Sequence, residues 1–207
     1  MDVIRLIASS LSGYFLGSAN TSLIVGKIYG TDVRKHGSGN AGMTNTLRIL
    51  GKLPALLVVL GDVLKGILAC YLGAMIAGYP GMLLGGFFAV IGHNWPAYFR
   101  FKGGKGALTS ITVIFYIDWK IGLIVTSVFL AVFALSRYVS LGSIAGALAL
   151  TISAVAMRIS GSGNGLMFVI FSILISALVI LRHKENIKRL LSGTEAKLGM
   201  SSDRKGD

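Results

Sequence analysis

Long, nearly continuous apolar runs dominate this chain of 207 residues, and they restrict the folds it can adopt. The runs cover residues 3–25, 53–78, 81–99, 107–136, 141–159 and 166–181. Charged residues make up only 14% of the chain, whereas a soluble domain has about 25%. A chain inside a bilayer must satisfy its own backbone hydrogen bonds, which leaves helices or a closed barrel. The apolar/polar alternation typical of barrel strands is absent, so we predict an all-α integral membrane protein.

The run at 107–136 is too long for one span. As a single helix it would measure about 45 Å, and fitting it into a hydrocarbon core of about 30 Å would need an unusually large tilt. Asp118, Trp119 and Lys120 interrupt the run with two charges and an interfacial aromatic ring. We therefore predict a short helix at 107–117 and a longer one at 121–136, which makes seven helices in all.

The basic residues favour this number of helices. With seven helices, most Lys and Arg residues fall on one side, and only Arg5, Lys120 and Arg158 fall on the other. The positive-inside rule then places the N-terminus outside and the C-terminus in the cytoplasm. The first run begins after Asp2 and lacks a small-residue cleavage site, so we interpret it as a retained span.

Residues 1–195 are predicted to form a single membrane-embedded domain, and residues 196–207 a polar, mobile cytoplasmic tail. This topology brings four polar stretches to the cytoplasmic face: 36–48, 92–110, 137–143 and 182–195. Stretches far apart in the sequence are therefore expected to share one surface.

The first stretch, HGSGNAGMTNTLR, offers hydrogen-bond donors from both backbone and side chains. The candidates are Ser38, Gly39, Asn40, Thr44, Asn45 and Arg48. Glycines allow successive N–H groups to turn toward one anion, and an arginine can grip a phosphate with paired donors. The alternative is a flexible polar loop, which is equally common for such a composition.

The second stretch contains Gly103, Gly104 and Lys105, a fragment of a P-loop. The full pattern requires Ser or Thr after the lysine, and Gly106 stands there instead, so nucleotide binding is poorly supported. The predicted helix start at Ala107 would still suit an anion. Alternatively, the glycines only break a helix and Lys105 only orients the chain.

In the fourth stretch, Arg182, Asn186 and Arg189 can share one face of a helix. His183 can act there as an acid, a base or a donor, although an amphipathic helix lying on anionic lipid is a strong alternative. Inside the predicted spans, Asp62 and Lys65 are expected to form a structural ion pair. His93 is interpreted as an interface anchor at a helix end.

Some chemistries are excluded. No histidine is followed by the H-x₄-D pattern of many acyltransferases, and no carboxylate or histidine cluster suggests a metal site. The net charge of +12 lies in loops beside the predicted spans, so it indicates membrane orientation rather than nucleic-acid binding. The remaining cationic and hydroxyl groups predict a site for two oxyanions, with no metal and no cofactor.

Three stretches together resemble a known family. SGNAGMTNTLR (38–48), GHNWPAYFRFKGGKG with Thr109 (92–109) and RHKENIKRLLSGTE (182–195) look like the three signature motifs of the acyl-phosphate:glycerol-3-phosphate acyltransferases, the PlsY family. Their order and spacing agree with the family. Met43 and the pair Ala107-Leu108 depart from the usual residues, and none of these differences changes a polar group.

The resemblance implies a seven-helix enzyme of the bacterial inner membrane with its active site at the cytoplasmic face. It would transfer a fatty acyl group from acyl phosphate to the 1-position of sn-glycerol 3-phosphate, the first step of phospholipid biosynthesis, without a cofactor. The products would be lysophosphatidic acid and inorganic phosphate. The implied residues at the acyl-phosphate phosphoryl group are Ser38, Gly39, Asn40, Thr44, Asn45, Gly103 and Gly104. Those implied for glycerol 3-phosphate are Arg48, Lys105, Ser143, His183 and Asn186, of which Lys105, His183 and Asn186 would be catalytic.

Two other functions are consistent with parts of the sequence. A transporter for a phosphorylated solute would use glycine-rich spans and a half-helix, but it also predicts polar residues distributed toward both faces of the membrane. A scaffold that recruits soluble enzymes would not require the motif residues. The sequence leaves open whether the basic C-terminal end contacts membrane lipid or soluble enzymes of fatty-acid or phospholipid synthesis.

Overall fold

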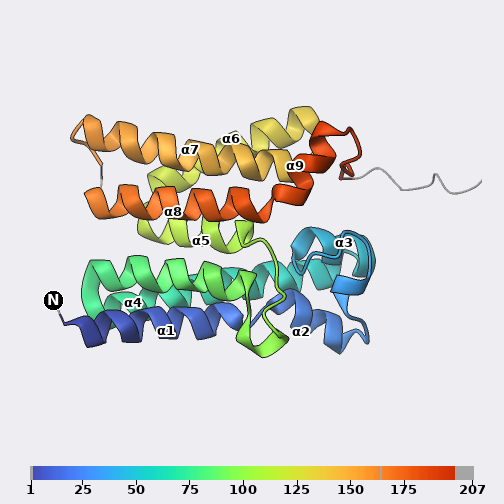
Figure 1. Ribbon diagram of the computed structural model, residues 1–207, viewed down its shortest axis with the longest axis horizontal. Helices are drawn as coiled ribbons and strands as arrows, with labels where there is room; N and C mark the ends of the chain where they lie inside the picture. The colour runs from blue at the N-terminus through green and yellow to red at the C-terminus, as the bar shows by residue number, and fades with distance from the viewer. Residues whose placement is uncertain (1, 164, 199–207) are drawn as a thin grey trace, which may run out of the picture.

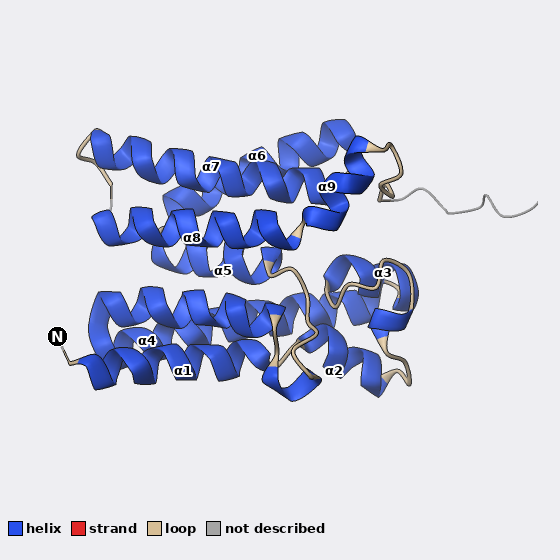
Figure 2. Ribbon diagram, in the orientation of Figure 1, coloured by secondary structure: helices blue, strands red, loops and turns tan. Residues whose placement is uncertain are grey.

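The computed structural model describes residues 2–163 and 165–198, and these residues form helices joined by turns and loops (Figure 2). The elements in chain order are α1 (Val3–Ser18), α2 (Thr21–Ile28), η1 (Val33–Lys35), α3 (Met43–Leu50), α4 (Lys52–Asn94), η2 (Ala97–Phe99), α5 (Ala107–Ile117), α6 (Trp119–Ser136), α7 (Val139–Ile159), α8 (Leu166–Arg182) and α9 (Lys184–Leu191). The predicted all-helical class is confirmed over this part of the chain.

The long helices lie roughly side by side in layers (Figure 1). The helices α1 and α4 form one side, α6 and α7 form the other, and α5 and α8 lie between them. Among the described helices, α4, α6 and α7 are long and apolar enough to cross a membrane, and the bent pair of α8 and α9 would make a fourth span. Only 17% of α6 is buried within the protein, as expected for an apolar helix that faces lipid. The number of seven spans and their orientation stay predictions.

The element α4 is a helical hairpin rather than one straight helix. Its torsion angles leave the helical region at Ala77 and at Gly78, where φ is +62°. This conformation favours glycine, and it reverses the chain so that residues 52–76 and 79–94 form two arms. The arms correspond to the predicted runs 53–78 and 81–99. Small residues allow close approach, since a Cβ on Gly73 would clash with the backbone of Gly81.

The predicted first span over residues 3–25 is not a single helix. The helix α1 ends at Ser18, and α2 begins at Thr21 after a break. Asn20 caps α2 by accepting a hydrogen bond from the Leu23 amide, and its Nδ2 lies 3.3 Å from the His93 carbonyl and 3.4 Å from that of Ala41. The Ala19 carbonyl accepts from Lys65 Nζ at 3.4 Å. The polar groups freed by the break therefore have buried partners.

The predicted division of the run 107–136 is confirmed. The helix α5 covers Ala107–Ile117, and α6 begins at Trp119. The Asp118 carboxylate accepts hydrogen bonds from the amides of Lys120 and Ile121, which is how an N-cap residue starts a new helix.

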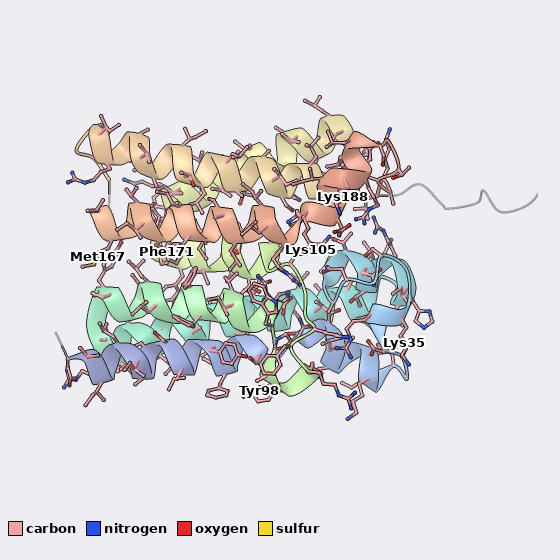
Figure 3. All side chains as sticks on the ribbon, viewed as in Figure 1. Lys35, Tyr98, Lys105, Met167, Phe171 and Lys188 are labelled. Atoms are coloured by element: carbon pink, nitrogen blue, oxygen red, sulfur yellow. The ribbon has the colours of Figure 1, made fainter. Side chains whose placement is uncertain are left out.

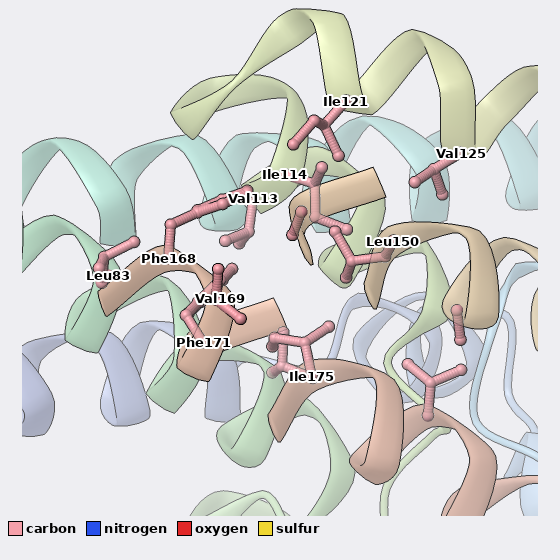
Figure 4. Packing of buried hydrophobic residues seen from close by; sticks show 14 of the residues in the cluster. Leu83, Val113, Ile114, Ile121, Val125, Leu150, Phe168, Val169, Phe171 and Ile175 are labelled. Atoms are coloured by element: carbon pink, nitrogen blue, oxygen red, sulfur yellow. The ribbon is translucent and has the colours of Figure 1, made fainter. Parts of the chain in front are cut away.

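The main hydrophobic core holds α5 against its neighbours (Figure 4). Its largest fully buried side chains come from α4 through α8: Val90, Val113, Ile121, Leu150, Phe168 and Ile175. Because interiors of this kind are close-packed, the core fixes where the first residues of α5 lie.

The polar segments gather at one end of the bundle. The elements α2, α3 and α9 lie at the end opposite the start of α1 (Figure 1). Beyond α9 the chain stays attached through Leu198, whose amide donates to the Arg137 carbonyl at 3.0 Å. Residues 199–207, which make up most of the predicted tail, lie outside the described residues.

The contact between α1 and α4 gives a testable prediction. A Cβ on Gly13 would fall on the backbone of Gly85, whereas a Cβ on Gly165 would meet nothing within 4 Å. We expect Gly13→Ala to destabilise the protein by about 1–3 kcal/mol and Gly165→Ala, at the N-cap of α8, to cost less, about 0.5 kcal/mol. Thermal unfolding of the detergent-solubilised variants measures both; equal midpoints for the two would contradict this packing.

Candidate active site

A cavity of about 1090 Å³ opens at the polar end of the bundle and extends between the helices. Figure 3 shows Lys105 between the lower and upper groups of helices, at the end where α9 carries Lys188. The cavity lining includes most of the residues singled out in the sequence: Ser38, Asn40, Thr44, Asn45, Arg48, Lys105, Ser143, His183 and Asn186. Gly39, Gly103 and Gly104 do not line it.

Lys105 connects the loop before α5 to α9. Its Nζ donates a hydrogen bond of 2.5 Å to Asn186 Oδ1. Burial lowers the pKa of Lys105; the charge of Glu195 opposes the shift and the charges of Arg189, Arg182 and Arg48 add to it, so that the pKa is about 8. The ammonium is therefore charged at neutral pH but poorly solvated, and such a group interacts strongly with an anion.

The loop at 36–42 is held in shape by Asn45 at the start of α3. Asn45 Oδ1 accepts from the Ser38 amide at 2.9 Å, and its Nδ2 donates to the carbonyls of Val33 and His36. Asn45 is only 1% exposed, so its side chain serves mainly to order the loop. Ser38 and Asn40 are among the residues that line the cavity.

The glycines before α5 are engaged with other backbone groups. The amides of Gly103 and Gly104 donate to the carbonyls of Asn94 and His93 at 3.2 and 3.1 Å. The Gly104 carbonyl accepts two hydrogen bonds from the Arg182 guanidinium. These contacts place Lys105; a direct contact between the two glycines and an anion stays a prediction.

The N-terminus of α5 reaches the cavity. Gly106, with φ at +75°, is its N-cap, and it lines the cavity together with Ala107 and Leu108. The first amides of a helix have no acceptor within the helix, and they carry a partial positive charge. This helix start therefore offers an anion both donors and a favourable field.

His183 lies at the 57° bend between α8 and α9. Its Nδ1 is 2.8 Å from the Val179 carbonyl, and because a carbonyl only accepts, Nδ1 carries the hydrogen. Burial lowers the pKa of His183 to about 4, although the hydrogen bond to Val179 opposes the shift. The neutral ring therefore keeps a lone pair on Nε2 that can accept a hydrogen bond from a hydroxyl group.

Glu195 is a site residue that sequence reasoning did not select, although it lies within the third motif. Its Oε1 accepts hydrogen bonds from Ser140 Oγ and Asn186 Nδ2, both at 2.6 Å, and its Oε2 pairs with Arg189 Nε at 2.7 Å. Burial alone would raise the pKa of Glu195, but these three hydrogen bonds make the net shift downward. The ionised carboxylate thus orients the Asn186 amide toward Lys105.

The two serines on α7 differ in their contacts. Ser140 donates to Glu195, whereas Ser143 Oγ donates to the Val139 carbonyl of its own helix at 2.9 Å. Both serines line the cavity, so the structure adds Ser140 to the residues around the predicted Ser143.

The expected ion pair of Asp62 and Lys65 is confirmed at 2.7 Å. The interpretation of His93 as an interface anchor is wrong, because His93 is 3% exposed and its Nδ1 lies 2.9 Å from Lys65 Nζ. The reason is the α4 hairpin, which folds His93 back onto Lys65. Both Asp62 and His93 line the cavity.

The inner part of the cavity is apolar. It is lined by residues from four helices: Ile111 and Ile114 of α5, Val125 and Phe129 of α6, Leu150 of α7, and Ile175 and Val179 of α8. The cavity therefore fits an amphipathic ligand that has anionic groups at one end and a hydrocarbon chain at the other.

Known proteins are similar to this chain over nearly its whole length. The family model described as glycerol-3-phosphate acyltransferase matches residues 7–193. The glycerol-3-phosphate acyltransferase of Clostridioides difficile is 42% identical over 98% of this chain and 100% of its own length. That of Thermoanaerobacter pseudethanolicus is 39% identical over 95% of this chain and 98% of its own.

Two solved structures are also similar. The glycerol 3-phosphate form of PlsY (YgiH), an integral membrane glycerol 3-phosphate acyltransferase, has 35% identity and a TM-score of 0.85, covering 94% of this chain and 96% of its own. Its lysophosphatidic acid form gives a TM-score of 0.82 with the same identity, covering 94% of this chain and 95% of its own.

The lowered pKa of Lys105 predicts pH-dependent anion binding. Its ammonium is present below a pH of about 8 and is lost above it. Sulfate keeps its charge across this range, so its affinity for the cavity should fall as the pH rises from about 7 to about 9.5. Calorimetric titration with sulfate measures the effect, and Lys105→Arg, which stays charged, should bind with little change over the same range. A wild-type affinity that does not vary with pH would contradict this assignment.

Proposed function

Because the chain belongs to the family of glycerol-3-phosphate acyltransferases, we propose that it transfers a fatty acyl group from acyl phosphate to the 1-hydroxyl of sn-glycerol 3-phosphate. The products are 1-acyl-sn-glycerol 3-phosphate (lysophosphatidic acid) and inorganic phosphate, and the reaction is the first step of phospholipid biosynthesis. One observation carries the proposal: a single cavity joins Lys105 and its cationic and hydroxyl neighbours to an apolar channel between α5 and α8.

The acyl phosphate lies with its chain in the apolar part of the cavity and its phosphoryl group at the loop 36–42 and the start of α5. Ser38, Asn40 and Thr44 supply side-chain donors there, and the first amides of α5 supply backbone donors. Asn45, Gly39, Gly103 and Gly104 belong to the same site through the backbone that they shape. The apolar lining stabilises the hydrocarbon chain by removing it from water.

Glycerol 3-phosphate lies at the opposite side of Lys105. Arg48, Lys105, Ser143, His183 and Asn186 bind it, and all five line the cavity. Arg48 is tied to the chain after α9, since its Nη2 lies 3.3 Å from the Ala196 carbonyl. Holding two phosphorylated molecules next to each other makes the reaction effectively unimolecular.

In the reaction, the 1-hydroxyl oxygen forms a bond to the acyl carbon, and the bond from that carbon to the phosphate oxygen breaks. Lys105 stabilises the negative charge that develops on the acyl oxygen. Acyl phosphate is a reactive mixed anhydride, so no covalent enzyme intermediate is required. The phosphoryl donors at the start of α5 stabilise the phosphate as it leaves.

The hydroxyl proton passes to the departing phosphate in this mechanism. His183 is a weak base, since burial lowers its pKa to about 4, and a general base acts best with a pKa near the working pH. The Nε2 lone pair of His183 instead accepts a hydrogen bond from the 2-hydroxyl of glycerol 3-phosphate, which holds the substrate in place and leaves the proton of the 1-hydroxyl to pass to the phosphate. The orienting role requires the neutral ring that the buried environment favours.

The enzyme is an integral membrane protein, and we place it in the bacterial inner membrane with the cavity at the cytoplasmic face. Basic residues gather at the cavity end of the bundle, in agreement with the positive-inside rule. Membrane lipids surround the apolar helices, and contact with soluble lipid-synthesis enzymes would involve this same end of the molecule.

Purified protein in lipid vesicles, supplied with palmitoyl phosphate and glycerol 3-phosphate, should release inorganic phosphate and form lysophosphatidic acid. Lys105→Ala should lower kcat/KM at least about 100-fold, because an oxyanion-stabilising donor is lost. Lys102→Ala is the matched control: Lys102 is an exposed lysine of the same loop that does not line the cavity, and its loss should leave kcat/KM unchanged.

Two outcomes would contradict the proposal. Turnover with palmitoyl-CoA but none with palmitoyl phosphate would exclude the acyl-phosphate donor. Uptake of glycerol 3-phosphate into the vesicles without any acylated product would indicate a transporter.

A further inference from the structure

A buried cluster of Asp62, Lys65 and His93 reaches the cavity, yet the mechanism above does not use it. The three side chains belong to the two arms of α4 and are 1%, 5% and 3% exposed. Lys65 Nζ lies 2.7 Å from Asp62 Oδ1 and 2.9 Å from His93 Nδ1, and Asp62 Oδ1 lies 3.7 Å from the same ring nitrogen. Of the three, Asp62 and His93 line the cavity.

This geometry fixes the protonation of the imidazole. The adjacent Asp62 carboxylate keeps Lys65 as an ammonium, and an ammonium only donates hydrogen bonds. His93 Nδ1 must therefore accept from Lys65, and the hydrogen of the neutral ring lies on Nε2. Since Asp62 and Lys65 cancel in charge, the cluster as a whole is neutral, which is the arrangement that a buried ion pair requires.

His93 Nε2 lies where the two phosphoryl-binding segments meet. A Cβ on Gly104 would fall both on His93 Nε2 and on the Ala41 carbonyl, so these groups are immediate neighbours. Asn20 Nδ2 bridges the carbonyls of Ala41 and His93, and the Gly104 amide donates to the His93 carbonyl. The backbone of His93 thus ties the loop 36–42 to the loop before α5.

Among the described residues, Lys65 makes its hydrogen bond to the His93 ring at Nδ1. No described residue accepts a hydrogen bond from the Nε2–H group. His93 lines the cavity, so its unpaired Nε2–H group can donate to an acceptor that enters there. A phosphoryl oxygen is an acceptor of this kind, and it would add negative charge where the start of α5 offers a favourable field.

We propose that His93 is a substrate-binding residue whose Nε2–H donates a hydrogen bond to the phosphoryl group of acyl phosphate. The inference rests on the proposed function, because that function places the phosphoryl group at the loop 36–42 and the start of α5, where His93 lines the cavity. Asp62 and Lys65 are positioning residues: Asp62 holds Lys65, and Lys65 fixes the tautomer and the orientation of the ring.

Two substitutions of His93 separate this role from a structural one. His93→Asn keeps an acceptor near Nδ1 for Lys65 but has nothing at Nε2. His93→Gln has an amide donor near the position of Nε2. We expect His93→Asn to raise the KM for palmitoyl phosphate about 10-fold or more, the loss typical of a hydrogen bond to a charged group, with the KM for glycerol 3-phosphate nearly unchanged. His93→Gln should restore the KM for palmitoyl phosphate to within about threefold.

The contrary outcomes are distinct. If His93→Asn behaves like the wild type while His93→Gln is impaired, only the contact with Lys65 matters and the proposal is wrong. Equal rises in both KM values together with a lower unfolding temperature would show a structural role and would also overturn it. Wild-type protein that does not turn over palmitoyl phosphate would refute the proposed function and this inference with it.

Nitrogen NMR of the wild-type protein tests the tautomer and the phosphate contact directly, and a variant serves only to assign the spectrum. The chain has 3 histidines, so ¹⁵N-histidine labelling gives few resonances, and the His93→Gln spectrum assigns those of His93. We expect a neutral ring with hydrogen on Nε2 and a shift of the Nε2 resonance when inorganic phosphate is added. A hydrogen on Nδ1, or an Nε2 resonance that phosphate does not move, would overturn the assignment.

Discussion

Polar groups surrounded by apolar helices need partners within the protein, and this requirement organises the whole structure. Asn20 satisfies the backbone at the break between α1 and α2, and Lys65 is held by Asp62 and His93. Lys105 and Glu195 meet at Asn186 in the same way. A buried donor or charge without a partner is costly, so each of these groups is paired within the protein. The pairs lie at the end of the bundle where the cavity opens. The apolar core of α5 to α8 then holds that end in place.

Much of the fold could be predicted because it follows from local properties. The length of the run 107–136 and the charges at 118–120 predicted the break before α6. The turn residues at 78–81 predicted that the chain reverses there, and the two arms of α4 meet at Gly78. The break at Ala19 was not predictable, because the partners of Asn20 are Ala41 and His93, which are distant in the sequence. Helix periodicity contains no information about such contacts.

In the candidate site, too, the residue types could be predicted from the sequence, whereas the contacts between distant residues could not. The motifs identified many of the residues that line the polar part of the cavity, among them Arg48, Lys105 and Asn186, since anion binding requires those residue types. Glu195 and His93 were missed as site residues because their roles depend on Ser140, Asn186 and Lys65, which tertiary packing alone brings to them. Packing also shows Asn45 ordering its own loop and the amides of Gly103 and Gly104 bonded to backbone carbonyls. In this arrangement the carboxylates of Asp62 and Glu195 line the cavity together with the cations, and they hold Lys65, Asn186 and Arg189 in place.

The convergence of three distant segments on one side of the membrane is the central claim, and cysteine accessibility tests it most directly. Single cysteines at the exposed positions His36, Lys102 and Lys188 would be introduced after replacing the buried Cys70 with alanine. In sealed vesicles, a membrane-impermeant thiol reagent applied from one side should modify either all three positions or none. Modification of one position from the outside and another only from the inside would contradict a shared site.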